Sequence, residues 1–179
     1  MSSTTAKQHP LSLSAEDRAR VEEVDQLARR GPASLPVLVQ GLDAPSWAVR
    51  RAVVSALARL GTAAVESLCE VLRHRRDNEA RIAAAVDALV AATGDVEGPV
   101  ELLGDDPNPA IVCDAAQVLG RRRSRRSVPL LSRLIVHPDD NVAVAAIEAL
   151  GRVGGGAAVD ALLAALGSGN FFRIFPAID

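Results

Sequence analysis

One leucine recurs along the chain at a nearly constant interval. Leu27, Leu57, Leu89, Leu119 and Leu150 are separated by 30, 32, 30 and 31 residues. An apolar residue stands three positions before each of them, and a small or apolar residue stands directly before most of them. Apolar positions three and four residues apart lie on one face of a helix. The pattern therefore predicts five copies of one helix, which we call helix A.

A second apolar set follows each of these leucines and predicts a second helix, helix B. Its members are three or four residues apart, which again marks one face of a helix. They are Leu35, Leu38 and Leu42; Val65, Leu68 and Leu72; Val96, Val100 and Leu103; Val128, Leu131 and Ile135; and Val159, Leu162 and Leu166. Each unit is therefore helix A, a short turn, helix B and a polar break.

The turns and breaks between these helices carry their own signals. The residue four positions after each recurring leucine is glycine in three units, and it is Thr93 or Arg123 in the other two. Glycine suits the left-handed residue that often ends a helix. The polar breaks are rich in Asp, Asn and Ser, which cap the start of a following helix. These signals predict where each helix A ends and where the next one begins.

The repeat predicts a stacked array. A single helix pair of about 30 residues cannot bury its apolar face alone, so neighbouring pairs must cover one another. We therefore predict an all-α fold, a right-handed α-solenoid of about five helix pairs plus a truncated sixth. We place the pairs at residues 15–43, 44–76, 77–106, 107–139 and 140–169, with the partial sixth at 170–179. Residues 1–14 are polar, and we expect them to form a disordered arm.

Two stretches resemble HEAT-like repeats of the phycobilisome-lyase type. They are WAVRRAVVSALARLGTAAVESLCEVL, which begins at Trp47, and NVAVAAIEALGRVGGGAAVDALLAAL, which begins at Asn141. The short elements LPVL and VPLL match the start of helix B in that family, and the resemblance extends over residues 18–179. It implies a stacked helical fold. It leaves the function open, because such repeats serve as chromophore lyases, signalling scaffolds, adaptors and accessory subunits.

The resemblance also bears on two arginines. Arg50 and Arg51 resemble the Val-Arg element that begins helix A in this family. The family pattern implies that such an arginine pairs with an aspartate of a neighbouring repeat, and Asp43 is the candidate partner here. We interpret that pair as structural.

The last ten residues look like the start of another repeat. At an offset of 31, Ala177 and Ile178 fall on Ala146 and Ile147. We therefore expect the chain to be a piece of a longer solenoid that is cut inside a sixth helix A. That end would expose apolar side chains and favour self-association; the alternative is a genuine terminus that packs them back on the fifth repeat. The side chains concerned are Phe171, Phe172 and Phe175.

Composition narrows the classes of partner. The formal net charge is −2, so the chain lacks the overall positive field of nucleic-acid binders, and we consider nucleic acid a disfavoured partner. Lys7 is the only lysine among 20 basic residues, which suggests a bacterial source. The chain has no apolar run of membrane-spanning length and no apolar segment near Met1, so we expect a cytoplasmic protein with no membrane contact.

Cys69 and Cys113 lie within apolar helical patterns, which favours the interpretation that both are small buried side chains.

The densest local charge is a run of five arginines within residues 121–126. We predict that Arg121, Arg122, Arg125 and Arg126 bind a partner, because guanidinium groups pair well with carboxylates and phosphates. The alternative is a solvated turn whose cations complement the end of helix A. No aromatic residue is interleaved with the arginines, so bases would have nothing to stack on. An acidic protein or a small anion is the better partner for this turn.

Charged residues also mark the outward side of helix B, which usually lines the concave face of such solenoids. The mixture of acids with one arginine suits a protein ligand better than DNA, whose phosphates need uniform positive charge. The candidates on this side are Glu66, Glu70, Glu97, Glu101, Arg133 and Asp160. Trp47, at the start of a helix A, is a further candidate because tryptophan is common in interface hot spots. It could instead pack between neighbouring repeats.

The chain shows none of the common catalytic patterns. Its three histidines, His9, His74 and His137, form no H-E-x-x-H motif, and no G-x-S-x-G motif or phosphate-binding glycine loop occurs. We therefore predict a non-catalytic scaffold or adaptor that binds another protein, within a bacterial signalling complex, and that needs no metal or cofactor. The first alternative is a lyase, or a lyase subunit, for a bilin-type chromophore, on the family resemblance alone. The second is binding of an anion or nucleic acid by the arginine-rich turn.

Overall fold

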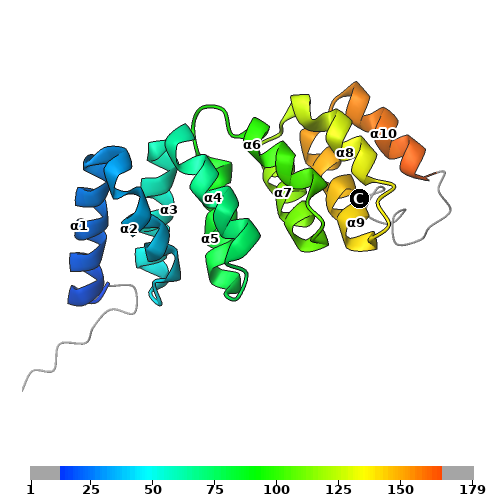
Figure 1. Cartoon of the computed structure of the whole chain (residues 1–179). Helices are drawn as coiled ribbons and strands as arrows, with labels where there is room; N and C mark the ends of the chain where they lie inside the picture. The colour runs from blue at the N-terminus through cyan, green and yellow to red at the C-terminus, as the bar shows by residue number, and fades with distance from the viewer. Residues whose placement is uncertain (1–12, 167–179) are drawn as a thin grey trace, which may run out of the picture.

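The computed structural model describes residues 13–166, apart from the side chain of Ala165, and this part of the chain consists of helices and turns without a strand. The helix A copies are α1 (Ala15–Arg29), α3 (Trp47–Leu60), α5 (Glu79–Ala91), α7 (Pro109–Arg121) and α9 (Asp140–Val153). The helix B copies are α2 (Leu35–Gln40), α4 (Thr62–His74), α6 (Glu97–Glu101), α8 (Val128–Leu134) and α10 (Gly156–Leu166). The pairs follow one another along an elongated array from α1 to α10 (Figure 1). The predicted helical solenoid is confirmed.

Several sequence predictions concern residues outside this part of the chain. Of the predicted disordered arm, only Leu13 and Ser14 are described, and the partial sixth repeat at 170–179 lies within the undescribed residues 167–179. Phe171, Phe172 and Phe175 are in the latter segment, so they too lie outside the described residues.

The polar breaks cap the helices as their composition predicts. The side chains of Ser14, Asn78, Asn108 and Asp139 accept hydrogen bonds from backbone N–H groups in the first turns of α1, α5, α7 and α9. These caps satisfy donors that have no partner inside the helix. Ser46, which precedes α3, makes no such side-chain bond.

Left-handed residues follow helix A at or next to the predicted positions. Gly31, Gly61 and Gly154 have φ angles of 73°, 57° and 67°. In the third unit the left-handed residue is Gly94 (φ 86°), one position after the predicted Thr93. This difference arises because α5 ends at Ala91 and the next residue is extended. In the fourth unit Arg123 takes this conformation, with φ 54°, although it has a Cβ atom.

Replacing Arg123 with glycine should stabilise the protein. A left-handed conformation costs an L-residue roughly 1–2 kcal/mol, and glycine removes this cost. We expect the free energy of unfolding to rise by about 1 kcal/mol in urea denaturation, after allowance for the greater freedom of glycine in the unfolded chain. The control is Arg123→Ala, which removes the charge but keeps the Cβ atom. An equal gain from the alanine variant would show that charge, and not backbone conformation, limits stability here.

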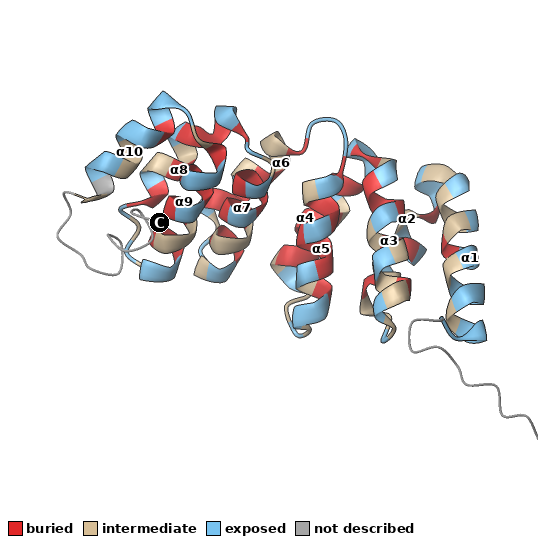
Figure 2. Ribbon diagram, turned by 180° about the vertical axis from the view of Figure 1, so that it is seen from behind, coloured by how far each residue is buried: buried red, intermediate tan, exposed pale blue. Residues whose placement is uncertain are grey.

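The core runs through the whole array between the two rows of helices (Figure 2). Four of the recurring leucines, Leu57, Leu89, Leu119 and Leu150, have no exposed surface, and Leu27 on the terminal helix α1 is only partly buried. Consecutive A helices pack on one another, as α7 packs on α9. Buried alanines of helix A, which include Ala84, Ala115 and Ala146, fit this close packing.

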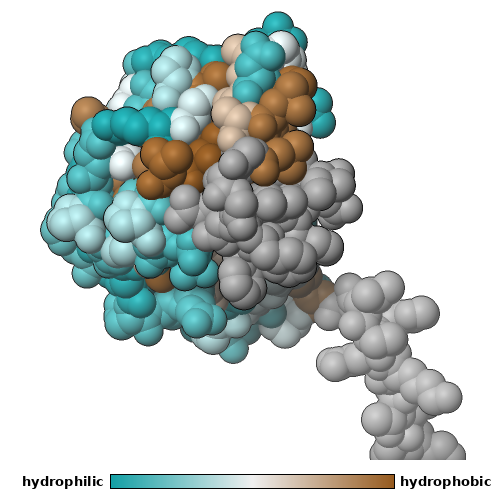
Figure 3. All heavy atoms as spheres, turned by 90° about the vertical axis from the view of Figure 1, so that its right-hand side faces the viewer, coloured by the Kyte–Doolittle hydropathy of each residue, from teal (hydrophilic) through white to brown (hydrophobic). Residues whose placement is uncertain are grey.

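The last helix departs from the predicted pattern. Val159 was placed on the buried face of helix B, but Ala158 is the buried residue of α10 and Val159 is exposed. Leu162, the next residue of the predicted face, does pack against the core, so the difference concerns the start of α10. Val159 and Leu163 leave apolar surface at this end of the array (Figure 3).

Ion pairs between repeats join the polar breaks. Asp43 contacts both Arg75, at 2.7 Å, and the Nε of Arg81. The Arg81 guanidinium also donates to the carbonyl of Arg75 at 3.0 Å, and its side chain is only 9% exposed. The expected pairing of Asp43 with Arg50 is therefore wrong. Arg50 instead donates to the backbone carbonyls of Ala44 and Pro45. It lies in the first turn of α3, which follows this polar break directly.

Candidate functional site

The arginine-rich turn between α7 and α8 is held to the preceding repeat. Arg122 donates from Nη1 to the carbonyls of Leu89, Val90 and Ala92, at 3.1, 3.0 and 2.8 Å. Its Nε donates to Glu97 at 3.0 Å. Arg122 thus caps the C-terminal end of α5, where carbonyls lack helical partners.

These contacts occupy two of the residues that were predicted to bind a partner. The side chains of Arg122 and Glu97 are 14% and 19% exposed and are occupied by each other and by backbone. Burial alone would raise the pKa of Glu97, but its own backbone N–H and the Arg122 guanidinium bring that pKa below the ordinary value. The pair is a structural clamp between repeats, and the sequence could not separate it from its exposed neighbours.

Of the remaining arginines of the turn, two form ion pairs with acids and two do not. Arg121 pairs with Asp87 at 2.8 Å. Arg126 lies 3.4 Å from Asp95 and 3.6 Å from Glu101. Arg123 and Arg125 are exposed and form no ion pair with any residue of segment 13–166. The run of five arginines therefore presents far fewer unpaired cations than its sequence suggests.

Three predicted residues surround one groove on the helix B side of the array. The groove lies between the third and fourth repeats and has a volume of about 460 Å³. Its lining combines exposed apolar side chains with acids and arginines. The lining residues are Gly98, Glu101, Leu102, Asp105, Arg126, Pro129, Leu130 and Arg133. We refer to this feature as the Leu102 groove.

The charged residues of the Leu102 groove are paired across it. Arg133 lies 2.7 Å from Asp105, and Arg126 lies 3.6 Å from Glu101. Glu101 also accepts a hydrogen bond from the buried Ser127 hydroxyl at 2.7 Å, which fixes its carboxylate. The groove therefore has fixed polar groups of both signs around an apolar centre.

Leu102 forms that apolar centre together with Pro129. The Leu102 side chain is 69% exposed, although its neighbour Leu103 is fully buried. Sequence reasoning missed it because the spacing of helix B assigns Leu103 to the core and leaves Leu102 unassigned. The adjacent leucines could have indicated it, because neighbouring residues of a helix point in different directions and only one of the two can face the core.

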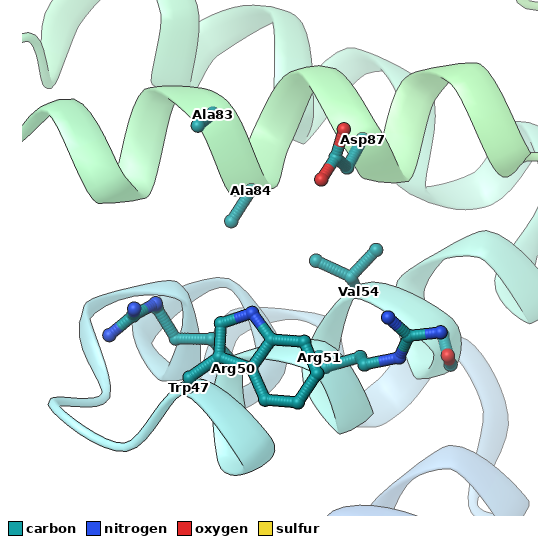
Figure 4. A pocket seen from close by; sticks show the side chains of 8 residues that line it. Trp47, Arg50, Arg51, Val54, Ala83, Ala84 and Asp87 are labelled. Carbon is teal, nitrogen blue, oxygen red and sulfur yellow. The ribbon is translucent and has the colours of Figure 1, made fainter.

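Other predicted residues lie away from this groove. Glu66 and Glu70 are exposed on α4 and face Arg73, with the nearer carboxylate, that of Glu70, at 3.0 Å. Asp160 is exposed on α10. Trp47 begins α3 on the helix A side of the array and is 66% exposed, so it does not pack between repeats (Figure 4).

The cysteines and possible metal ligands were also located among the described residues. Residues 13–166 bring together no group of three or more His, Cys, Asp or Glu side chains that could hold a metal ion. Burial, with Glu66 nearby, raises the pKa of the Cys69 thiol to about 12, so this cysteine is a neutral core residue as predicted. Cys113 is only half-buried. None of the described helices is both long and apolar enough to cross a membrane.

Comparison with known proteins identifies the family. The pattern that defines HEAT repeats matches residues 11–89 and 96–174. The chain belongs to the HEAT-repeat family. No match was found among curated proteins.

One solved structure with a TM-score above 0.5 supports the fold. This HEAT-repeat chain resembles human deoxyhypusine hydroxylase in complex with glycerol, with a TM-score of 0.54 and 20% identity. The match covers 90% of this chain and 66% of the hydroxylase chain, and at this identity it shows the fold alone. An engineered protein matches with a TM-score of 0.43 and 19% identity, over 92% of this chain and 90% of its own. A designed armadillo repeat protein in complex with the peptide (KR)4 matches with a TM-score of 0.42 and 18% sequence identity, and the match covers 90% of each chain.

Proposed function

We propose that this HEAT-repeat protein is a non-catalytic scaffold or adaptor that binds another protein through the Leu102 groove. The observation that carries the proposal is the exposed Leu102 side chain, held beside Pro129 and enclosed by ion pairs. An apolar centre with a polar rim is the usual anatomy of a protein interface. HEAT and armadillo repeat proteins commonly act as protein-binding scaffolds, which agrees with this proposal.

The charges of the groove favour a protein over a nucleic acid. Two acids, Glu101 and Asp105, balance two arginines, Arg126 and Arg133. Binding of a phosphate backbone requires more cations than acids. The Leu102 groove has equal numbers of the two. A partner helix or extended segment with an apolar side chain at its centre suits both the volume and the mixed charge.

The finer parts of the proposal rest on the sequence. We propose a bacterial, cytoplasmic protein, supported by its almost exclusive use of arginine over lysine. We further propose a place in a signalling complex, on the resemblance to repeats used in that way. The exposed Val159 and Leu163 support self-association through the α10 end as an additional contact.

Two alternatives have weaker support. The resemblance to phycobilisome-lyase-type repeats supports a chromophore lyase, and an absorbance titration with a bilin separates that activity from simple scaffolding. Binding of an anion by the arginine-rich turn would rest on Arg123 and Arg125, because Arg121, Arg122 and Arg126 already pair with acids.

Replacing Leu102 with aspartate should abolish capture of the partner. A charge at the centre of an apolar contact loses burial energy and adds a desolvation cost, so we expect recovery to fall at least about tenfold. The measurement is quantitative mass spectrometry of proteins from source-cell lysate retained by the immobilised chain. The Leu102 side chain is exposed, so the variant should fold like the wild type.

The matched control is Val136→Asp, which introduces the same charge at a side chain that is 73% exposed but does not line the groove. It should retain the partner at the wild-type level. If both variants capture the same proteins as the wild type, the Leu102 groove is not the binding site.

A further inference from the structure

A second groove lies on the helix A side, between α3 and α5 (Figure 4). Its volume is about 370 Å³, and it is open to solvent. Aromatic, basic and small apolar side chains line it, with one acid. They are Trp47, Arg50, Arg51, Val54, Ser55, Ala83, Ala84 and Asp87. We call it the Trp47 groove, and none of its residues takes part in the Leu102 groove.

The α3 wall of the Trp47 groove combines an indole with a cation. The Arg51 guanidinium lies 5.3 Å from the centroid of the Trp47 ring, within the range of a cation–π contact. Both side chains are exposed, and no carboxylate among residues 13–166 pairs with Arg51. This contact holds a rigid aromatic face beside a guanidinium whose hydrogen-bond donors remain available.

The other residues leave this end of the groove positive. Arg50 is bound to the carbonyls of Ala44 and Pro45 at 2.6 and 3.0 Å, so its guanidinium lies on the other side of Trp47 from that of Arg51 and its charge is not neutralised by an acid (Figure 4). The one acid of the lining, Asp87, is paired with Arg121 at 2.8 Å. The lining therefore holds two arginines against one acid, and that acid is shared with Arg121.

Apart from Asp87, the opposite wall is small and apolar. Ala83 and Ala84 of α5 face the α3 side chains, and Val54 lies between them and Arg51 (Figure 4). Small side chains at this position leave room for a large one from a partner. The groove thus offers an apolar slot next to a positive, aromatic end.

We propose that the Trp47 groove binds an acidic peptide segment of a partner protein. A carboxylate of the segment pairs with the Arg51 guanidinium, and a neighbouring leucine-like side chain enters the slot between Trp47 and Ala83. Charge complementarity selects this occupant, because the unpaired guanidinium of Arg51 needs an anion and the apolar slot needs a hydrocarbon side chain. A nucleic acid fits less well, since a lone tryptophan and one unpaired arginine do not form a basic track. This site is separate from the proposed function and does not depend on it.

The test uses the intrinsic fluorescence of Trp47, which is the only tryptophan of the chain. The probe is the blocked peptide Glu-Glu-Leu-Leu-Glu-Glu, titrated at low salt into the whole chain. We expect a saturable change in Trp47 emission. The neutral peptide Gln-Gln-Leu-Leu-Gln-Gln should bind at least about tenfold more weakly, as should Glu-Glu-Ser-Ser-Glu-Glu.

Two variants on opposite walls of the groove complete the test. Arg51→Glu reverses the charge that the segment pairs with, and Ala83→Glu places a like charge in the slot. Both positions are exposed, so the fold should be retained, and each variant should weaken binding of the acidic peptide at least about tenfold. Leu102→Asp should bind it like the wild type, which separates this site from the Leu102 groove. The proposal is overturned if emission does not change, if either groove variant binds normally, or if a duplex oligonucleotide binds there in preference to the peptide.

Discussion

Replacement of Asp43 with alanine is expected to lower the free energy of unfolding by about 3 kcal/mol, the range in which one partner is removed from a buried ion pair. Asp43 closes the first repeat, and its carboxylate contacts Arg75 from the second repeat and Arg81 from the third. The Arg81 side chain is 9% exposed, so its charge cannot regain full hydration when the carboxylate is removed. It would keep the contact with Asp77, at 2.5 Å on the surface, and the hydrogen bond to the Arg75 carbonyl, and neither replaces the carboxylate of Asp43 at its Nε.

Thermal unfolding followed by circular dichroism measures this effect. For a chain of this size, about 3 kcal/mol corresponds to a fall of about 6–12 °C in the Tm. The control is Asp105→Ala, which removes the partner of Arg133 from a pair whose side chains are 58% and 68% exposed. Exposed pairs contribute about 0–1 kcal/mol, so the control should shift the Tm by no more than a few degrees. Equal losses from the two variants would mean that burial of Arg81 does not determine the strength of its ion pair.

Replacement of Gly120 with alanine is the second change from which we expect a large effect. A Cβ atom at Gly120 would lie 2.6 Å from the Cα and 2.7 Å from the Cβ of Ala149. The obstacle includes the backbone of α9, so α7 and α9 must move apart, and this overpacking costs about 1–3 kcal/mol. The higher helix propensity of alanine offsets up to about 1 kcal/mol of that cost. Urea denaturation should still show a net loss of stability.

Gly151 provides a control at the equivalent position one repeat later. It follows Leu150 as Gly120 follows Leu119, but a Cβ atom added there would meet no atom within 4 Å. Gly151→Ala should therefore stabilise the protein by up to about 1 kcal/mol, through helix propensity alone. The same substitution is thus expected to have opposite signs at two equivalent positions. Destabilisation by both would contradict our account of the contact between α7 and α9.

Several features of the candidate sites follow from sequence and structure together. The sequence identified the arginine-rich turn and named Glu101, Arg126 and Arg133, and the structure brings these three residues to one groove. It also gave Trp47 as a candidate, and the structure places this residue on the helix A side beside Arg51. The sequence did not find Leu102, because the periodicity identifies apolar residues of the buried face and does not identify an apolar residue that is exposed outside that face.

The sequence by itself determined the repeat, the order of its helices and the turns between them. These features depend on interactions between residues a few positions apart: apolar residues on one face of a helix, polar caps before it and a left-handed residue after it. Even the unusual backbone of Arg123 occurs at the position that the repeat assigns to glycine in three other units.

The tertiary structure alone decided which members of each equivalent set have a special role. Arg122, and not its four neighbouring arginines, caps α5; Arg81, and not Arg50, pairs with Asp43; and Gly120 contacts a neighbouring helix where Gly151 does not. Each of these choices is made by a contact about one repeat away along the chain, where the direction of a side chain depends on how two helix pairs stack. Local sequence patterns contain no information on that geometry, because every repeat presents the same spacing while its neighbours differ.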